Sequence, residues 1–514
     1  MKDSSFIRIT KKIEYLGNKL PHPVYIFLFL LLITMLVSAV MGEMGVSLEY
    51  QAYDAQAGVV HKTLEITNLL SKEELKNFLV NLISAYQSNT VLIPTLMVGM
   101  ALAVAEETGF FESLFKRLLW KTPAYIVTYV FSVVSICGNI ASEAGQIMVA
   151  AIGAVLFRAM GRNPWIGIAL GWAGGSAGFT ANLMPATTDV LLSNITESFN
   201  TTGLYTPVHA LSNYFFLAVA TLTGAAVLTI ITEKFTVVTY GDTPASERLA
   251  SGMSEFGSQE RRGLRWAGRG FLVFVAVVLV MTVPTNGMLR NADGTLLPTS
   301  PLVKSIVQLI CIAFLLVGLL YGYGAGKISS KKEIPKLIQA GVVRLTPTIV
   351  TLVPAMLFLY QFNRCGLATY ISVKGEQLLE SIHLTGVPLL IVFALVCTFL
   401  NMFMTSGSTK WLIIAPIFVP MFANLGIHPA VTQLAYRIGE SCTNNIAPVQ
   451  PVLVIILGLL QDNWNKERNP EAPGMGTLLA GQIPYSIGLL FIFLLQFVLF
   501  YALNLPIGPG ITMR

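Results

Sequence analysis

Polar interruptions within apolar sequence constrain the fold of this chain most strongly. Between Val387 and Pro451, two apolar limbs flank a polar turn from Asn401 to Trp411, and a third apolar segment beginning near Pro429 is interrupted from Glu440 onward. Irregular backbone is tolerated at membrane depth only where protein buries it or where it lines a watery cavity. The pattern therefore predicts a re-entrant hairpin followed by a broken helix, around a binding site at the membrane midplane.

The composition indicates a multispanning membrane protein. The 514 residues are 54% hydrophobic and only 12% charged, whereas an ordinary soluble domain has about 25% charged residues. Repeated apolar runs of spanning length, separated by short basic loops, indicate one integral membrane domain over residues 1–514. The net charge of +6 does not indicate nucleic-acid binding, because the basic residues lie beside apolar spans, where they set orientation.

The sequence shows no motif of a metal centre. Its five cysteines have no CxxC spacing and lie mostly in apolar runs, and its five histidines form no HExxH. We therefore expect neither an enzyme nor a cofactor. Two alternatives remain open: an intramembrane hydrolase would turn over a substrate, and a passive channel would conduct without concentrating its solute.

The apolar runs predict nine crossing helices, with a cytoplasmic N-terminus and a periplasmic C-terminus. The basic residues of segment 1–22 place the N-terminus inside, and most of the 33 Lys and Arg residues then fall on the cytoplasmic side. Segment 43–77 is expected to be an external loop, and 233–269 a cytoplasmic loop. The crossing helices are expected at about 24–41, 91–105, 164–200, 211–232, 270–286, 302–324, 344–362, 429–461 and 481–504.

The order of parts around residues 387–461 already occurs at 122–200. Two apolar limbs flank the polar segment from Gly138 to Gly145, and the following helix is interrupted by GFTANLMPATTD. A shift of 265 residues aligns prolines at the starts of corresponding parts, including Pro164 with Pro429. The first hairpin is expected to enter from the cytoplasm and the second from outside. The chain therefore reads as two inverted repeats, an arrangement that supports alternating access in many transporters.

Five ionisable residues fall at the hairpin tips and helix breaks: Glu143, Asp189, Lys410, Arg437 and Glu440. An ionisable side chain at the midplane costs about 2.5–3.5 kcal/mol even on mild insertion scales. Either function or mutual pairing must offset that cost. These residues therefore bind a ligand, or Asp189 or Glu440 pairs with Arg437 or Lys410 and stabilises the fold. The planar guanidinium of Arg437 suits bidentate binding of a carboxylate.

Hydroxyl and amide side chains at the same breaks are candidates for holding Na⁺, together with Glu440 and Glu143 as anionic ligands. The alternative is that these side chains satisfy the broken backbone. Trp411 either stacks on an aromatic substrate or anchors the hairpin tip by packing. The neutral polar candidates are Asn182, Thr187, Thr188, Thr405, Ser406, Ser408, Thr443, Asn444 and Asn445.

Several longer strings resemble the p-aminobenzoyl-glutamate transporter family (AbgT) over nearly the whole chain. They include GFTAN and TTDVLLS (178–193), APIFVPMF (415–422), YRIGES (436–441) and LPIGPGI (505–511). The resemblance implies a homodimer with nine helices and two hairpins per subunit. It also implies cation-coupled movement of p-aminobenzoyl-glutamate, a folate breakdown product, or export of p-aminobenzoate-like sulfonamides.

Carried over by position, the resemblance implies transport roles for Asp189, Trp411, Pro429 and Arg437, and a cation site that includes Asn401 and Glu440. The family usually has Asp where this chain has Glu143 and Glu440, and a neutral residue where it has Lys410. Lys410 then either occupies the place of a coupling cation or adds a contact for a dicarboxylate.

These observations predict a secondary transporter of the bacterial inner membrane that imports p-aminobenzoyl-glutamate or a similar aromatic amide of glutamate. Arg437 is expected to bind a carboxylate, with Trp411 along the aromatic part and Asp189 on the aniline or amide or in a proton relay. Glu440 and Asn401 are expected to hold the coupling cation, Na⁺ or H⁺. The alternative is a proton-driven exporter of sulfonamides and p-aminobenzoate-like drugs.

Overall fold

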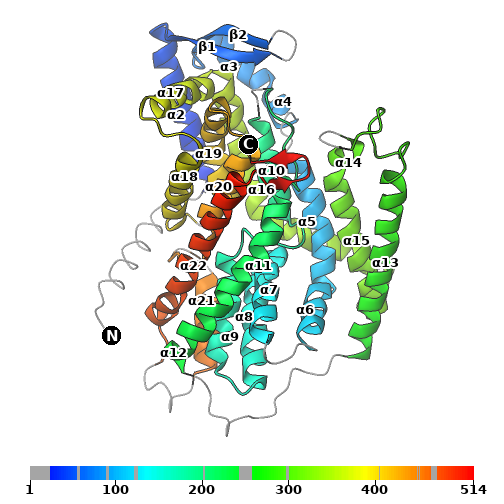
Figure 1. The fold of residues 1–514 in the computed structure, drawn as a ribbon. Coiled ribbons are helices and arrows are strands. Elements are labelled where there is room, and N and C mark those ends of the chain that lie inside the picture. Colours follow the sequence, from blue (N-terminus) through cyan, green and yellow to red (C-terminus); the bar gives the residue numbers. More distant parts are fainter. Residues whose placement is uncertain are drawn as a thin grey trace.

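Helices dominate the computed structural model (Figure 1). In the described ranges the strands form two short antiparallel hairpins, so the predicted helical membrane fold is confirmed with two small β additions. The structure describes residues 23–54, 58–87, 92–120, 126–200, 203–241, 257–296, 300–404, 406–448, 450, 452–464 and 472–513.

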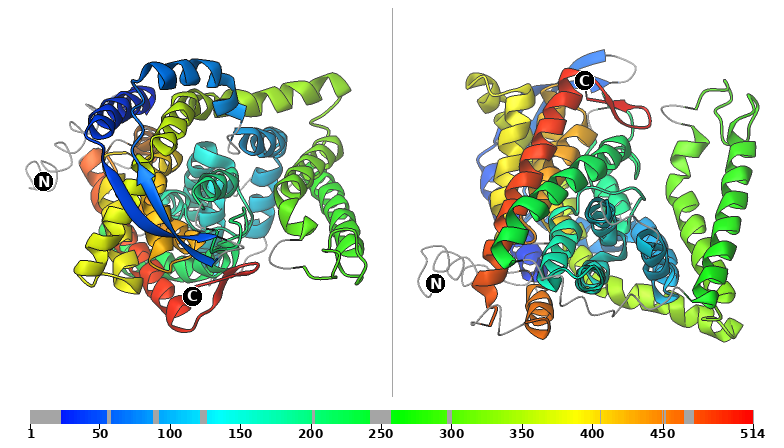
Figure 2. Two further views of the ribbon diagram at one scale, coloured as in Figure 1. Left: turned by 90° about the horizontal axis from the view of Figure 1, so that it is seen from above. Right: turned by 60° about the horizontal axis from the view of Figure 1, so that its bottom comes forward.

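The predicted external loop contains a β-hairpin and an amphipathic helix. Ser47 pairs with Glu65 at the open end of the hairpin, and the Ser71 hydroxyl caps the following helix by accepting the N–H of Glu74 at 3.3 Å. Figure 2 shows the hairpin lying across one end of the molecule. The elements of this region are α2 (Pro23–Glu43), β1 (Ser47–Asp54), β2 (Gly58–Glu65), α3 (Lys72–Val80), α4 (Leu82–Gln87), α5 (Leu92–Glu107) and α6 (Phe110–Trp120).

The two predicted repeats are confirmed by their helix boundaries. Helix α8 shifted by 265 residues coincides with α19 at both ends, and α9 and α10 begin where α20 and α21 begin. The first repeat comprises α7 (Val127–Cys137), η1 (Gly138–Ala141), α8 (Ser142–Ala159), α9 (Pro164–Trp172), η2 (Ala173–Ala177) and α10 (Thr187–Ser198). The second comprises α18 (Gly386–Asn401), α19 (Gly407–Asn424), α20 (Pro429–Ser441) and α21 (Val452–Asp462).

Both broken helices begin at the predicted prolines. Pro164 follows Asn163, whose side chain accepts the N–H of Trp165 at 3.0 Å, and Pro429 follows His428, whose ring accepts the N–H of Ala430 at 3.0 Å. A proline in the first helical turn needs no hydrogen-bond acceptor, because it has no N–H. The same start signal therefore fixes the beginning of the broken helix in each repeat.

The repeats run in opposite directions. In Figure 1 the α7–α8 hairpin lies in the lower half and the α18–α19 hairpin in the upper half. The first broken helix proceeds from α9 below to α10 above, whereas the second proceeds from α20 above to α21 below. The predicted inversion is confirmed, and it brings the breaks of both repeats toward the middle of the molecule.

Helix α8 crosses α9 at a very close approach. A Cβ atom added at Gly153 would lie 2.2 Å from the carbonyl oxygen of Gly167, and one at Gly167 would lie 2.0 Å from that of Gly153. Glycine at both positions therefore lets the two backbones touch, as small residues do between membrane helices. This contact fixes the first hairpin against its broken helix.

The remaining helices surround the repeats, with α13 and α15 paired at one side (Figures 1 and 2). They are α11 (Tyr214–Ile231), α12 (Val237–Tyr240), α13 (Ser258–Thr282), α14 (Pro301–Lys304), α15 (Ile306–Gly324), α16 (Ile334–Arg364), α17 (Leu367–Ser381) and α22 (Met475–Ala502). Shorter elements are η3 (Thr232–Thr236), η5 (Lys331–Glu333), β3 (Pro506–Gly508) and β4 (Ile511–Thr512).

Among the described residues, five helices are long and apolar enough to cross a membrane, or seven if two bent helix pairs each count as one span. The broken helices fall below that length because each is interrupted. With each broken helix counted once, α2, α5, α9–α10, α11, α13, α15, α16, α20–α21 and α22 correspond to the nine predicted crossings over the described ranges.

Three element boundaries differ from the sequence prediction. The expected cytoplasmic loop at 233–269 is largely helical where it is described, because α13 begins at Ser258 and carries the arginines from Arg261 to Arg269; residues 242–256 lie outside the described part. Helix α16 begins ten residues earlier than the expected 344–362, at Ile334. Helix α17 was not anticipated at all. Charged residues mark where a span leaves hydrocarbon, but a helix continues past that point.

Candidate functional site

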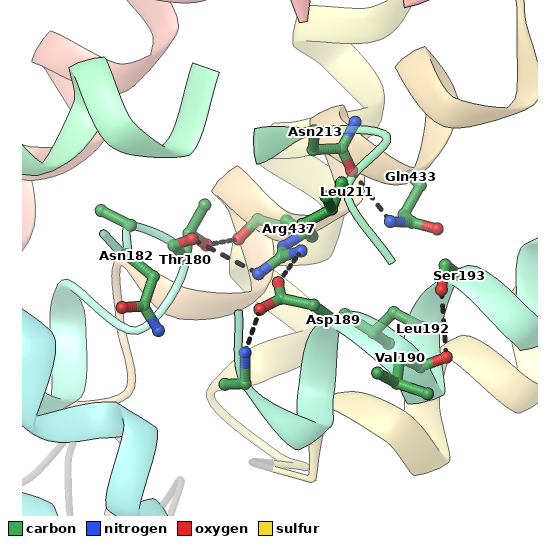
Figure 3. Close-up of polar contacts among 12 residues, drawn as sticks. Thr180, Asn182, Asp189, Val190, Leu192, Ser193, Leu211, Asn213, Gln433 and Arg437 are labelled. Atoms are coloured by element: carbon green, nitrogen blue, oxygen red, sulfur yellow. Dashed lines mark hydrogen bonds and ion pairs between the residues drawn. The ribbon is translucent and has the colours of Figure 1, made fainter. Parts of the chain in front are cut away.

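A buried ion pair joins the two repeats. Arg437 of α20 approaches Asp189 of α10, with 2.6 Å between Nη1 and Oδ1, and their side chains are only 4% and 3% exposed (Figure 3). The other carboxylate oxygen of Asp189 accepts the N–H of Ala186 at 2.6 Å, where α10 begins. The helix N-terminus and the guanidinium thus both stabilise this carboxylate. Both are predicted site residues, and their mutual pairing is one of the alternatives that the sequence leaves open.

The segment between η2 and α10 holds Arg437 from a second direction. Nη2 of Arg437 donates to the carbonyl oxygen of Thr180 at 3.4 Å, and the Thr180 hydroxyl donates to the carbonyl of Arg437 (Figure 3). The same hydroxyl shares a hydrogen bond with the Ser441 hydroxyl. Hydrogen bonds therefore hold the break of the first repeat against the broken helix of the second.

A cavity of about 380 Å³ lies beside Arg437, between the two repeats. This volume falls in the usual range for small-molecule sites. The cavity receives side chains from α8, α10, α20, the start of α19 and the breaks of both repeats. Its walls are Gln146, Phe179, Thr180, Thr188, Leu191, Leu192, Ser406, Gly407, Ser408, Arg437, Glu440, Asn444 and Gln450.

The cavity lining combines charged, polar and apolar surfaces. Arg437 and Glu440 supply opposite charges, whereas Phe179, Leu191 and Leu192 supply apolar surface. A guanidinium beside such surface suits a molecule with a carboxylate on an apolar or aromatic body. Six of the candidate residues from the sequence meet at this cavity: Thr188, Ser406, Ser408, Arg437, Glu440 and Asn444.

Glu440 packs against the tip of the second hairpin. A Cβ atom added at Gly407, the first residue of α19, would lie 2.3 Å from Oε1 of Glu440. The hydroxyl of Ser406 caps the same helix end by accepting the N–H of Thr409 at 3.4 Å. Glycine at position 407 therefore leaves room for a buried carboxylate beside the N-terminus of α19.

Gln146 is a cavity residue that the sequence analysis missed. It lies in the first turns of α8, is 3% exposed, and its carboxamide oxygen has no hydrogen-bond partner among the described residues. A buried amide oxygen without a partner costs about 1–3 kcal/mol. The signal was present in the sequence, because Gln146 directly follows the polar tip from Gly138 to Gly145.

Trp411 and Pro429 lie outside the cavity lining. The Trp411 ring is fully buried and stacks on Tyr436, with ring centroids 4.4 Å apart and planes inclined by 26°, and its Nε1 donates to Thr196 at 2.9 Å. Of the two alternatives for Trp411, this geometry matches packing of the hairpin tip. Pro429 occupies the first turn of α20 and fixes where that helix begins.

Asn182 braces the break of the first repeat and does not line the cavity. Its Nδ2 donates to Oδ1 of Asn139 at 2.9 Å, and Nδ2 of Asn139 donates to the carbonyl of Ala181 at 3.0 Å. This arrangement matches the alternative in which an amide satisfies broken backbone. Glu143 belongs to α8, but its side chain lies outside the described part of the structure, as does Thr405.

The predicted cation ligands meet beside the cavity, at the junction of α18, α19 and α20. Nδ2 of Asn401 donates to Oγ1 of Thr443 at 3.1 Å and to Oδ1 of Asn444 at 2.8 Å. Oδ1 of Asn401 accepts a hydrogen bond from Nζ of Lys410, which is 4% exposed. Lys410 thus lies within the predicted cation cluster and is not among the residues that line the cavity.

Comparisons with known proteins agree with this architecture. The family model for AbgT transporters (ABG_transport) matches residues 8–514. The p-aminobenzoyl-glutamate transport protein of Escherichia coli K12 is 34% identical over 504 residues, which cover 98% of this chain and 96% of that protein.

Two solved transporters have similar folds. The Alcanivorax borkumensis YdaH transporter gives a TM-score of 0.84 at 26% identity, with 95% of this chain and 100% of that chain covered. Neisseria gonorrhoeae MtrF, described as illuminating a class of antimetabolite efflux pumps, gives 0.88 at 31% identity, with 98% and 99% covered. This multispanning membrane protein therefore belongs to the AbgT transporter family.

Proposed function

We propose that this transporter moves p-aminobenzoyl-glutamate, or a similar aromatic amide of glutamate, across the bacterial inner membrane by coupling to a cation gradient. The observation that carries the proposal is that Arg437 lies in the wall of a cavity that Phe179, Leu191 and Leu192 also line. A relative that covers nearly the whole chain bears the name of this substrate. The protein is a carrier and catalyses no covalent reaction.

In this proposal, different residues around the cavity bind different parts of the substrate. Arg437 binds a carboxylate, and Asp189 holds the guanidinium in place while the carboxylate is absent. Ser406 and Ser408 at the hairpin tip bind polar groups of the substrate, beside the apolar wall of α10. Trp411 acts indirectly, because its stacking on Tyr436 positions the tip.

The inverted repeats support alternating access around this cavity. The protein works as a homodimer with its N-terminus in the cytoplasm and its C-terminus in the periplasm. The coupling cation is Na⁺ or H⁺, and Asn401, Asn444, Glu440 and Glu143 are the residues proposed to respond to it. Uptake measurements address the coupling directly.

Uptake into proteoliposomes tests the proposed function. Labelled p-aminobenzoyl-glutamate is supplied with an imposed Na⁺ gradient or an imposed proton gradient, for wild type, Arg437→Ala and the control Arg364→Ala, which removes a guanidinium outside the cavity. We expect accumulation above equilibrium with one gradient, retained in Arg364→Ala and lost in Arg437→Ala. Equal equilibration without either gradient would instead identify a passive pathway.

Export of antimetabolites is the second candidate function. It is favoured by the 31% identity and the TM-score of 0.88 to MtrF, which is described with antimetabolite efflux pumps. In the same proteoliposomes, a sulfonamide would then move against its own gradient when a proton gradient is imposed, whereas p-aminobenzoyl-glutamate would not accumulate. That result would identify the protein as an exporter of antimetabolites and not as an importer of p-aminobenzoyl-glutamate.

A further inference from the structure

Lys410 provides a positive charge inside the group of oxygen ligands that the sequence assigns to a cation. It belongs to the first turn of α19, and its Nζ donates to Oδ1 of Asn401 at the end of α18. The side chain is 4% exposed, so its charge is removed from water. A buried ammonium requires a compensating charge and hydrogen-bond acceptors.

The surrounding oxygens are already engaged with proton donors. Oδ1 of Asn401 accepts from Lys410, and Oδ1 of Asn444 and Oγ1 of Thr443 both accept from the amide of Asn401. The Thr443 hydroxyl in turn donates to the carbonyl of Thr398 at 3.3 Å. A Na⁺ ion at this place would have to displace these donors and approach the ammonium. Two like charges repel strongly at short range in a poorly solvated interior.

The charges of the described side chains at this junction also balance without a metal ion. Glu440 interacts electrostatically with Lys410 and Arg437, and Arg437 pairs with Asp189. Two cationic side chains and two carboxylates are thus buried in this region. An additional Na⁺ would leave a net positive charge among these buried groups, which is costly at membrane depth.

We propose that the ammonium of Lys410 is the resident cation at the second hairpin, and that this transporter neither binds nor needs Na⁺ there. The inference rests on the proposed function, because a coupling site is meaningful only in a transporter. It decides between the two interpretations of Lys410: the side chain replaces a coupling cation and does not contact a dicarboxylate. The residues around Asn401 therefore do not fit a sodium site in this chain.

Thermal unfolding of the purified protein in detergent tests this inference without any transport assay. The Tm is measured in NaCl and in choline chloride of equal ionic strength, so that screening is the same in both salts. Wild type is expected to have the same Tm in the two salts. Lys410→Gln removes the ammonium and leaves the oxygen ligands, so Na⁺ is expected to raise its Tm by about 2 °C when present at tenfold its Kd.

The matched control is Lys374→Gln, which removes an exposed lysine from α17 and is expected to behave like wild type. If Lys410→Gln does not fold, Lys410→Met keeps the apolar stem and provides the same comparison. A Na⁺-specific rise in the Tm of wild type, or no such rise in a folded Lys410 variant, would overturn the inference. Either result would leave the proposed function intact, because the Tm is measured without transport.

Discussion

At the scale of single residues, the centre of the site is the pair formed by Arg437 and Asp189. Their burial means that each charge depends on the other, so removing one partner leaves an uncompensated charge. The sequence predicted that both residues matter, because ionisable residues at helix breaks are costly. It left open whether Asp189 pairs with Arg437 or with Lys410, since α10 and α20 come together only through the packing of the two repeats.

Gln146 provides a test at the same scale. Replacing it by Leu keeps the size of the side chain but removes the unpartnered amide oxygen from the cavity wall. If this oxygen accepts an N–H of the substrate, the affinity for p-aminobenzoyl-glutamate falls by up to about tenfold, as expected for one neutral hydrogen bond. Equilibrium binding of labelled substrate measures the change.

The control for Gln146→Leu is Gln377→Leu, which removes an exposed carboxamide from α17. Because the Gln146 oxygen makes no hydrogen bond to the part of the chain that the structure describes, the Tm of Gln146→Leu should not fall. Unchanged affinity in Gln146→Leu would show that this side chain does not contact the substrate.

At the scale of elements, glycine, proline and polar residues predicted the hairpin tips and the helix breaks. These signals are local, and the structure places the starts of α9 and α20 at the expected prolines. The predicted starts of α13 and α16 were wrong, because these helices begin before the apolar window that marks a span. Helix α17 was missed because its amphipathic sequence lies between two spans and resembles a polar loop.

The tip of the second hairpin is sensitive to one added methyl group. In Gly407→Ala the new Cβ would lie 2.3 Å from Oε1 of Glu440, so this buried carboxylate would have to shift toward the cavity that it lines. We expect a loss of about 1–3 kcal/mol in stability from overpacking, with a large loss of uptake. The Tm and proteoliposome uptake together measure both effects.

Gly458→Ala is the matched control, because a Cβ at that position in α21 meets nothing within 4 Å. An alanine in the helix interior there should be neutral or slightly stabilising. Normal stability and uptake in Gly407→Ala would mean that Glu440 does not press against the hairpin tip.

Attachment of α3 to α16 should depend on pH. Arg364 donates to both carboxylate oxygens of Glu74, at 2.6 and 2.9 Å, and this hydrogen bonding lowers the pKa of Glu74 from its ordinary value of 4.5. A lowered pKa means that the interaction stabilises the folded state above pH 4.5 and is lost as the pH falls through the pKa of the folded state. The protection factors of the α3 amides, which correct for the slower intrinsic exchange in acid, should therefore fall as the pH drops below 4.5.

The comparison with Glu74→Gln isolates this effect. The variant should exchange faster than wild type at neutral pH, and the difference should shrink as the pH falls below 4.5. Glu73→Gln changes the same formal charge at an exposed neighbouring position and should leave exchange unchanged. A constant difference between wild type and Glu74→Gln at all pH values would contradict the role of the ion pair.

At the scale of the whole molecule, the inverted repeats explain why one cavity is lined by segments far apart in the sequence. The repeat was predicted from the matching positions of prolines and polar segments, and its inversion from the distribution of basic residues. The helix boundaries confirm the repeat. Membership of the cavity could not be predicted, as Gln146 and Trp411 illustrate. They occupy equivalent positions in α8 and α19, yet Gln146 lines the cavity and Trp411 packs against Tyr436. Sequence periodicity gives a position, whereas packing decides which side chain reaches the ligand.

Binding of p-aminobenzoyl-glutamate is compared with binding of analogues in which the α- or the γ-carboxylate is replaced by a carboxamide. Measured for wild type and Arg437→Gln, this comparison tests the central claim most directly. Wild type should prefer the carboxylate by more than about 30-fold, the usual range for truncating one partner of a buried charge pair. In folded Arg437→Gln the carboxylate should bind weakly, with no preference over the carboxamide. An undiminished preference for the carboxylate in Arg437→Gln would contradict a substrate carboxylate held by this arginine.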